Sequence, residues 1–180
     1  MNKTKLKFLI FVQLLTPILG ASPDPIFSEN GMVVSTSKQA SEAGVQILKR
    51  GGNAIDAAVA IGFALAVTSP SNGNIGGGGF LVATFADGRI ITQDHREKAP
   101  SLSHRDMFLS GSGDVIDGMS LYSRASSGVP GTVDGLVGIF RDHGSGAVSL
   151  KQVLAPAIKL AEKGFLISNY EAKHLNAYRN

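Results

Sequence analysis

The feature that most constrains the fold is an apolar stretch from Ala54 to Val67, in which Asp56 has the only polar side chain. Asn53 is a good helix N-cap, and Asp56 lies three positions later, so the stretch predicts a helix that runs to about Thr68. The stretch is shorter than the about 20 residues that span a bilayer. A helix that is apolar all round must be buried, so we expect this one to lie between layers of a globular fold.

Four consecutive glycines, Gly76 to Gly79, follow this helix and precede a predicted strand over residues 80–85. Phosphate-binding loops have the opposite order, with a strand before the glycines and a helix after them, so this run does not indicate nucleotide binding. The chain has 22 glycines in 180 residues, well above the usual share of about 7%. We interpret the run as a place where backbones approach closely.

The remaining pattern predicts both helices and strands. A short strand is expected at Met32–Val34, and a return strand begins at Ile90 after an Asp87-Gly88 hairpin turn. Further helices are expected over residues 37–50, 133–144, 149–164 and 168–180. Pro156 should restart or kink the third of these. The last has no stop signal before residue 180, so we expect the chain to be a piece of a longer protein.

The N-terminus has the order of a secretory signal peptide. Three lysines within residues 1–7 precede a mostly apolar stretch over residues 8–20, and small residues follow around Ala21. A membrane anchor is the alternative, but Pro17 interrupts a run that is already short. We therefore expect a signal peptide at residues 1–21, an irregular lead-in at residues 22–30, and export to a periplasm or outside the cell, with no membrane attachment after cleavage.

Removing the three leader lysines leaves 14 basic and 14 acidic residues, so the formal charge of +3 belongs to the leader. The mature chain has no basic stripe with interleaved aromatic residues, and we expect no nucleic-acid partner. The absence of cysteine excludes thiolate chemistry. No serine lies in a nucleophile-elbow pattern, and the four histidines are scattered, so we expect no metal and no cofactor.

One charged cluster stands out, formed by Asp94, His95, Arg96 and Glu97 at the end of the second predicted strand. Strand alternation places Asp94 and Arg96 on one face, and His95 and Glu97 on the other. An arginine held there by a carboxylate can offer its planar fork to a substrate carboxylate. A purely structural salt bridge is the alternative reading of the same residues.

Several segments, in this order, resemble the start of the γ-glutamyltranspeptidases. The resemblance covers residues 31–180 and rests on these segments: GGNAIDAAVAIGFALAVTSPSNGNIGGGGF, DHREKAP, RDMFL, SSGVPGTVDGL and LAPAIKLAEKGFLIS. It implies an α+β fold, the four-layer αββα sandwich of the N-terminal-nucleophile hydrolases, of which this chain would be the N-terminal part of the large subunit.

The resemblance also implies a function. Members of this family cleave their own precursor, and a threonine at the new N-terminus of the small subunit transfers the γ-glutamyl group of glutathione and related compounds to water, amino acids or peptides. Arg96 matches the arginine that binds the substrate α-carboxylate, and Glu97 matches an adjacent supporting glutamate. His95 stands where an aromatic residue is common. The nucleophilic threonine would lie beyond Asn180, so no catalytic residue is expected here, and the chain alone should be inactive.

Two alternatives remain open from the sequence. One is a related self-processing acylase that acts on β-lactam side chains and shares much of this scaffold. The other is a non-catalytic paralogue. A free α-carboxylate on the substrate is what would require Arg96, which favours γ-glutamyl compounds.

Overall fold

The computed structural model describes residues 24–177 and 179. The predicted signal peptide, residues 1–21, therefore lies outside the described residues, as do the first two residues of the predicted lead-in. The chain divides into two units, residues 1–31 and 32–180. In the first unit, residues 24–31 form no helix or strand, and the Ser28 hydroxyl donates a hydrogen bond of 2.6 Å to the Gly31 carbonyl oxygen.

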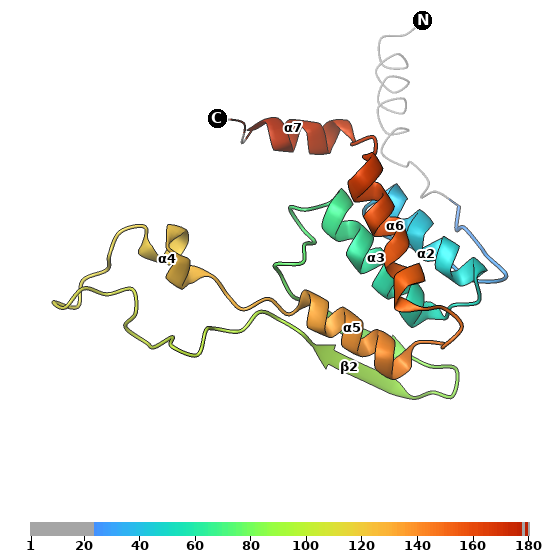
Figure 1. Cartoon of the computed structure of the whole chain (residues 1–180), viewed down its shortest axis with the longest axis horizontal. Helices are drawn as coiled ribbons and strands as arrows, with labels where there is room; N and C mark the ends of the chain where they lie inside the picture. The colour runs from blue at the N-terminus through green and yellow to red at the C-terminus, as the bar shows by residue number, and fades with distance from the viewer. Residues whose placement is uncertain (1–23, 178, 180) are drawn as a thin grey trace, which may run out of the picture. The chain divides into compact units, whose positions relative to one another are not determined.

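The second unit is α+β, as expected, with helices before and after a β-hairpin (Figure 1). Its elements in chain order are α2 (Lys38–Lys49), α3 (Ala54–Thr68), β1 (Phe80–Thr84), β2 (Ile90–Asp94), α4 (Met119–Tyr122), η1 (Arg124–Ser126), α5 (Thr132–His143), α6 (Leu150–Lys163) and α7 (Asn169–Ala177). Residues 99–128 form a long connection whose base is closed by an antiparallel bridge between Lys98 and Val129.

Helix α3 is the centre of the helical layer, which confirms that the apolar stretch is buried. It packs against α2, α6 and α5, and Val59 and Ala60 are completely buried. Two glycines permit this close packing. A Cβ on Gly44 of α2 would lie 2.7 Å from Ile61 of α3, and a Cβ on Gly62 of α3 would lie 2.8 Å from a methyl group of Leu136.

The N-terminus of α3 is fixed by a completely buried carboxylate. Oδ2 of Asp56 accepts the backbone N–H of Asn53 at 2.8 Å and the backbone N–H of Ser145 at 3.1 Å. The Asn53 side chain accepts the Asp56 N–H at 3.0 Å and donates to the His143 carbonyl oxygen at 2.9 Å. The predicted cap is therefore confirmed, and it also fastens the loop after α5 to the start of α3.

Asp56→Ala should lower the free energy of unfolding by about 3 kcal/mol, because two backbone N–H groups lose a charged, buried acceptor. The measurement is the thermal midpoint of the full-length protein. Asp117→Ala is the matched control, since Asp117 is exposed and makes no hydrogen bond or ion pair within the described part of the chain. Equal midpoints for the two variants would contradict this role of Asp56.

The two strands form an antiparallel hairpin in which Phe80 pairs with Asp94 and Thr84 pairs with Ile90. One face packs on the helices, with Leu81, Ala83, Phe85 and Ile91 against the core that includes Leu136 and Ile139 of α5. Figure 1 shows α5 lying between the hairpin and the α2, α3 and α6 helices. The other face is exposed, and three of its side chains are apolar: Phe80, Val82 and Ile90.

One local prediction was wrong. Met32–Val34 forms no strand, because no neighbouring segment among the described residues offers it backbone partners. Of the two outcomes predicted at Pro156, a restart or a kink, the restart does not occur, because helix α6 continues from Leu150 to Lys163. Val153 and Ala157, on either side of the proline, are buried in the helical layer. Their burial offsets the hydrogen bond that a proline removes from a helix interior.

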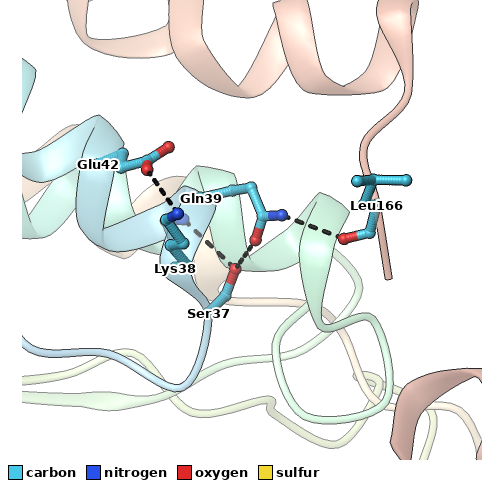
Figure 2. Close-up of polar contacts among 6 residues, drawn as sticks. Ser37, Lys38, Gln39, Glu42 and Leu166 are labelled. Atoms are coloured by element: carbon cyan, nitrogen blue, oxygen red, sulfur yellow. Dashed lines mark hydrogen bonds and ion pairs between the residues drawn. The ribbon is translucent and has the colours of Figure 1, made fainter. Parts of the chain in front are cut away.

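The segment after α6 is tied to the start of α2 (Figure 2). The Gln39 side-chain amide donates to the Leu166 carbonyl oxygen at 3.1 Å and accepts from the Ser37 hydroxyl at 3.2 Å. Beside them, Lys38 Nζ lies 3.9 Å from Glu42 Oε1. No helix in the described residues is both long enough and apolar enough to cross a membrane.

Candidate substrate-binding site

The segment that follows β2 carries both predicted site residues. Asp94 and Arg96 are exposed and lie on the outer side of the hairpin, whereas His95 and Glu97 are half-buried on the inner side. The Arg96 guanidinium carbon lies 5.9 Å from the centroid of the Phe80 ring on that outer face. The alternation predicted for these four residues is therefore confirmed.

Glu97 is the carboxylate that holds Arg96. Oε2 of Glu97 lies 3.1 Å from Nε of Arg96, and the Arg96 side chain remains 59% exposed. Asp94 acts on the backbone instead, because its Oδ1 accepts the Arg96 N–H at 3.0 Å. Within the described part of the chain, the Arg96 guanidinium donates no hydrogen bond, and its contact with Glu97 is an ion pair only. Its N–H donors are therefore available to a ligand.

The four-glycine run packs directly under this segment. A Cβ on Gly78 would lie 2.5 Å from the His95 carbonyl oxygen, 2.8 Å from the Arg96 Cα and 2.8 Å from the Glu97 nitrogen. The Gly77 carbonyl oxygen accepts the N–H groups of Gly131 and Thr132 at 2.9 and 3.0 Å. The prediction that this run serves close backbone approach is confirmed, and the Val129–Gly131 segment lies beside it.

A cavity of about 440 Å³ opens beside Arg96. Its lining includes Asn74, Gly77, Phe80, Arg96, Glu97 and Thr132. A smaller cavity of about 320 Å³ touches Arg96 from the side of Lys98, Pro130 and Asp134. Another cavity of about 450 Å³ lies at the start of α2, and neither predicted site residue lines it. The Arg96 segment therefore borders two of these spaces, which suits a side chain that binds a small molecule.

Two contacts of the site were not identified in the sequence. Thr132 donates its hydroxyl to the Asn74 carbonyl oxygen at 3.1 Å, which ties α5 to the glycine-rich loop. Gly135, inside α5, faces the His95 ring so closely that a Cβ there would overlap it. The available signal was Gly135 itself, because glycine in a helix interior is unfavourable and often indicates close packing. No group of three or more His, Asp or Glu side chains gathers as a metal site within the described residues.

The comparisons with known proteins agree on one family. The family model of the γ-glutamyltranspeptidases matches residues 40–180. The chain belongs to the γ-glutamyltranspeptidase family.

The matches to individual relatives cover most of this chain but less than half of each relative. The glutathione hydrolase proenzyme of Pseudomonas sp. (strain A14) is 47% identical over 169 residues, which are 92% of this chain and 29% of that protein. The crystal structure of Helicobacter pylori γ-glutamyltranspeptidase matches with a TM-score of 0.81 and 46% identity, covering 87% of this chain and 44% of that one.

A cephalosporin acylase structure from Bacillus halodurans also matches, with a TM-score of 0.68, 30% identity, and coverage of 88% of this chain and 30% of that one. The expected fold class is confirmed. The chain forms one part of the N-terminal-nucleophile hydrolase fold, namely helices on one face of a two-stranded sheet.

Proposed function

We propose that the full-length protein containing this chain is a γ-glutamyltransferase and glutathione hydrolase. In this proposal, Arg96 binds the α-carboxylate of the γ-glutamyl group, and Glu97 supports Arg96. Family membership and the name of the Pseudomonas relative support the activity.

The observation that carries the proposal is the geometry of Arg96. Glu97 lies 3.1 Å from Nε, the Arg96 side chain is 59% exposed, and Arg96 lines a cavity of about 440 Å³. A carboxylate matches the planar fork of arginine and binds it by two charge-assisted hydrogen bonds. Glu97 restricts the rotation of the side chain, so that less conformational freedom is lost when the substrate binds.

The bond-breaking chemistry is assigned to a threonine outside this chain. Its hydroxyl oxygen attacks the γ-carbonyl carbon, the carbon–nitrogen bond breaks, and the amine departs with a proton that the threonine's own α-amine has taken from the hydroxyl. Water or an amino acid then attacks the resulting ester and releases the threonine hydroxyl. The role of this chain is to hold the γ-glutamyl group in place, with no metal or cofactor in the proposed reaction.

The exposed face of the hairpin is proposed to meet the rest of the same precursor. Phe80, Val82 and Ile90 are 69%, 72% and 64% exposed there, which is a large apolar area for two short strands. A second sheet, from the part of the protein that contains the small subunit, would cover this face in the four-layer sandwich. The proposed partner is therefore a product of the same precursor.

The full-length protein is expected to cleave itself and to hydrolyse a γ-glutamyl anilide, and residues 22–180 alone are expected to do neither. The missing nucleophile is the reason. Aggregation of the shorter protein is also expected, because its hairpin leaves an apolar face and open strand edges exposed. Release of aniline measures the activity, and electrophoresis detects self-cleavage. Anilide hydrolysis by residues 22–180 would contradict the assignment of the chemistry to another part of the protein.

The likeness to cephalosporin acylase supports one second candidate, an acylase acting on β-lactam side chains. The same assay separates the candidates when β-lactam substrates are included. A full-length protein that cleaves itself and prefers those substrates would be an acylase, whereas a protein that neither cleaves itself nor hydrolyses either substrate would be the non-catalytic paralogue.

Export is part of the proposal. The lysine-rich start, apolar stretch and small residues within residues 1–22 support a cleaved signal peptide and a periplasmic or extracellular enzyme. N-terminal sequencing of the exported protein should find a start near Ala21. Retention of Met1 in a protein that stays inside the cell would contradict export.

A further inference from the structure

His95 is wedged between the glycine-rich loop and helix α5. Its backbone N–H donates to the Gly79 carbonyl oxygen at 3.0 Å, and its carbonyl oxygen accepts the Gly79 N–H at 3.3 Å. Its ring fills a slot between two glycines. A Cβ on Gly79 would lie 3.0 Å from Nε2, and a Cβ on Gly135 would lie 2.7 Å from Cδ2 and closer still to Cγ and Cβ.

The His95 ring is held in place by close packing and not by hydrogen bonds. Nδ1 of His95 is buried and makes no hydrogen bond to any described residue. A buried, unpaired polar atom costs about 1–3 kcal/mol, so the atom itself does not stabilise the fold. The contribution of the side chain is therefore the volume of its ring, which sets the distance between β2 and α5 at this point.

The next residue along the chain is Arg96, and its backbone is confined by two further glycines. The Arg96 Cα rests against Gly78, and a Cβ on Gly131 would overlap the His95 carbonyl oxygen and lie 3.1 Å from the Arg96 carbonyl oxygen. The backbone at Arg96 therefore has little room to move while the ring occupies its slot. A change in the volume of the slot must therefore shift the backbone of Arg96, a residue that lines the cavity of about 440 Å³.

We propose that His95 is a positioning residue for substrate binding: its ring, wedged between Gly79 and Gly135, sets the place of Arg96. This inference rests on the proposed role of Arg96 in binding the α-carboxylate. A ring of similar shape should perform the same task, whereas a smaller side chain at position 95 or a larger one at position 135 should not.

The test compares two substrates of the full-length protein, a γ-glutamyl anilide and a 4-aminobutanoyl anilide, which differ only in the α-carboxylate. The measured quantity is the ratio of their kcat/KM values. Gly135→Ala should lower this ratio at least tenfold, because the new methyl group displaces the ring. Gly138→Ala, three residues along the same helix, is the matched control, since its Cβ would make only an ordinary contact of 3.7 Å with Gln93.

Substitutions of His95 itself are tested in the same assay. His95→Ala should lower the ratio about tenfold, and His95→Phe should keep it within threefold of the original value. The double variant His95→Ala, Gly135→Ala should lose less than the two single changes multiplied together, because the overlap of the methyl group with the ring is removed and only the overlap with the Cβ of residue 95, at 2.4 Å, remains. The His95 and double variants keep the test informative if Gly135→Ala does not fold.

Arg96→Lys in the same assay distinguishes a failure of the proposed role of Arg96 from a failure of the proposed role of His95. If Arg96→Lys leaves the ratio unchanged, the proposed role of Arg96 fails. If Arg96→Lys lowers the ratio but His95→Ala does not, only the positioning role of His95 is overturned. A loss of kcat/KM that is equal for both substrates in the His95→Ala and Gly135→Ala variants would also overturn it, because that pattern is a general structural defect.

Discussion

Replacing Arg96 by lysine in the full-length protein is expected to raise KM for a γ-glutamyl anilide roughly 30-fold, a loss of about 2 kcal/mol. Lysine keeps the positive charge but lacks the planar fork, so a carboxylate loses one of two charge-assisted hydrogen bonds. The ion pair of Arg96 Nε with Glu97, at 3.1 Å, is also lost. Because the α-carboxylate takes no part in bond breaking, kcat should change much less than KM.

Arg89→Lys provides the control for this substitution. Arg89 lies at the other end of β2, beside the hairpin turn, where its guanidinium carbon is 4.3 Å from the centroid of the Phe85 ring and its Nε is 3.6 Å from Asp87. The same chemical change there should leave KM within twofold of the original value. A KM for Arg96→Lys no higher than that of Arg89→Lys would show that Arg96 does not bind the substrate.

Gly78→Ala is expected to reduce kcat/KM for the γ-glutamyl anilide roughly 100-fold and to destabilise the protein by about 1–3 kcal/mol. The added methyl group would meet three backbone atoms, of His95, Arg96 and Glu97, at 2.5–2.8 Å. None of these is the end of a flexible side chain, so the whole Arg96 segment must move away. Kinetics and the thermal midpoint of the full-length protein measure the two effects.

Gly76→Ala is the matched control within the same run of glycines. A Cβ on Gly76 would meet only the Asn74 side-chain oxygen, at 3.2 Å, and that side chain can turn aside. Activity and thermal midpoint should therefore stay close to the original values. If Gly78→Ala behaved like Gly76→Ala, the close packing of the glycine run under Arg96 would not be needed for binding.

Local signals were sufficient for most of the helices and for the side chains of the charged cluster. Asn53 and Asp56 predict the start of α3 because the cap is made by neighbours in sequence. Strand alternation depends only on the backbone of β2, and it predicts that Arg96 and Glu97 lie on opposite faces of the hairpin. Alternation alone does not predict Glu97 as the partner of Arg96; that contact agrees with the supporting role that the family resemblance implies for Glu97.

Contacts between distant segments explain what the sequence did not predict. Met32–Val34 has the composition of a strand, but a strand also needs a partner, which no local pattern can supply. Pro156 should interrupt α6, yet the burial of Val153 and Ala157 keeps the helix continuous. The slot for the His95 ring depends on Gly135, 40 positions along the chain in a different element, and no periodicity links the two.

The most direct test of the central claim is a crystal structure of the full-length protein with L-glutamate, the hydrolysis product, in its binding site. The expected result places two guanidinium nitrogens of Arg96 about 2.7–2.9 Å from the two oxygens of the α-carboxylate. Glu97 should remain on Nε. A glutamate whose α-carboxylate is bound by other side chains, with the Arg96 guanidinium directed away from it, would contradict the claim.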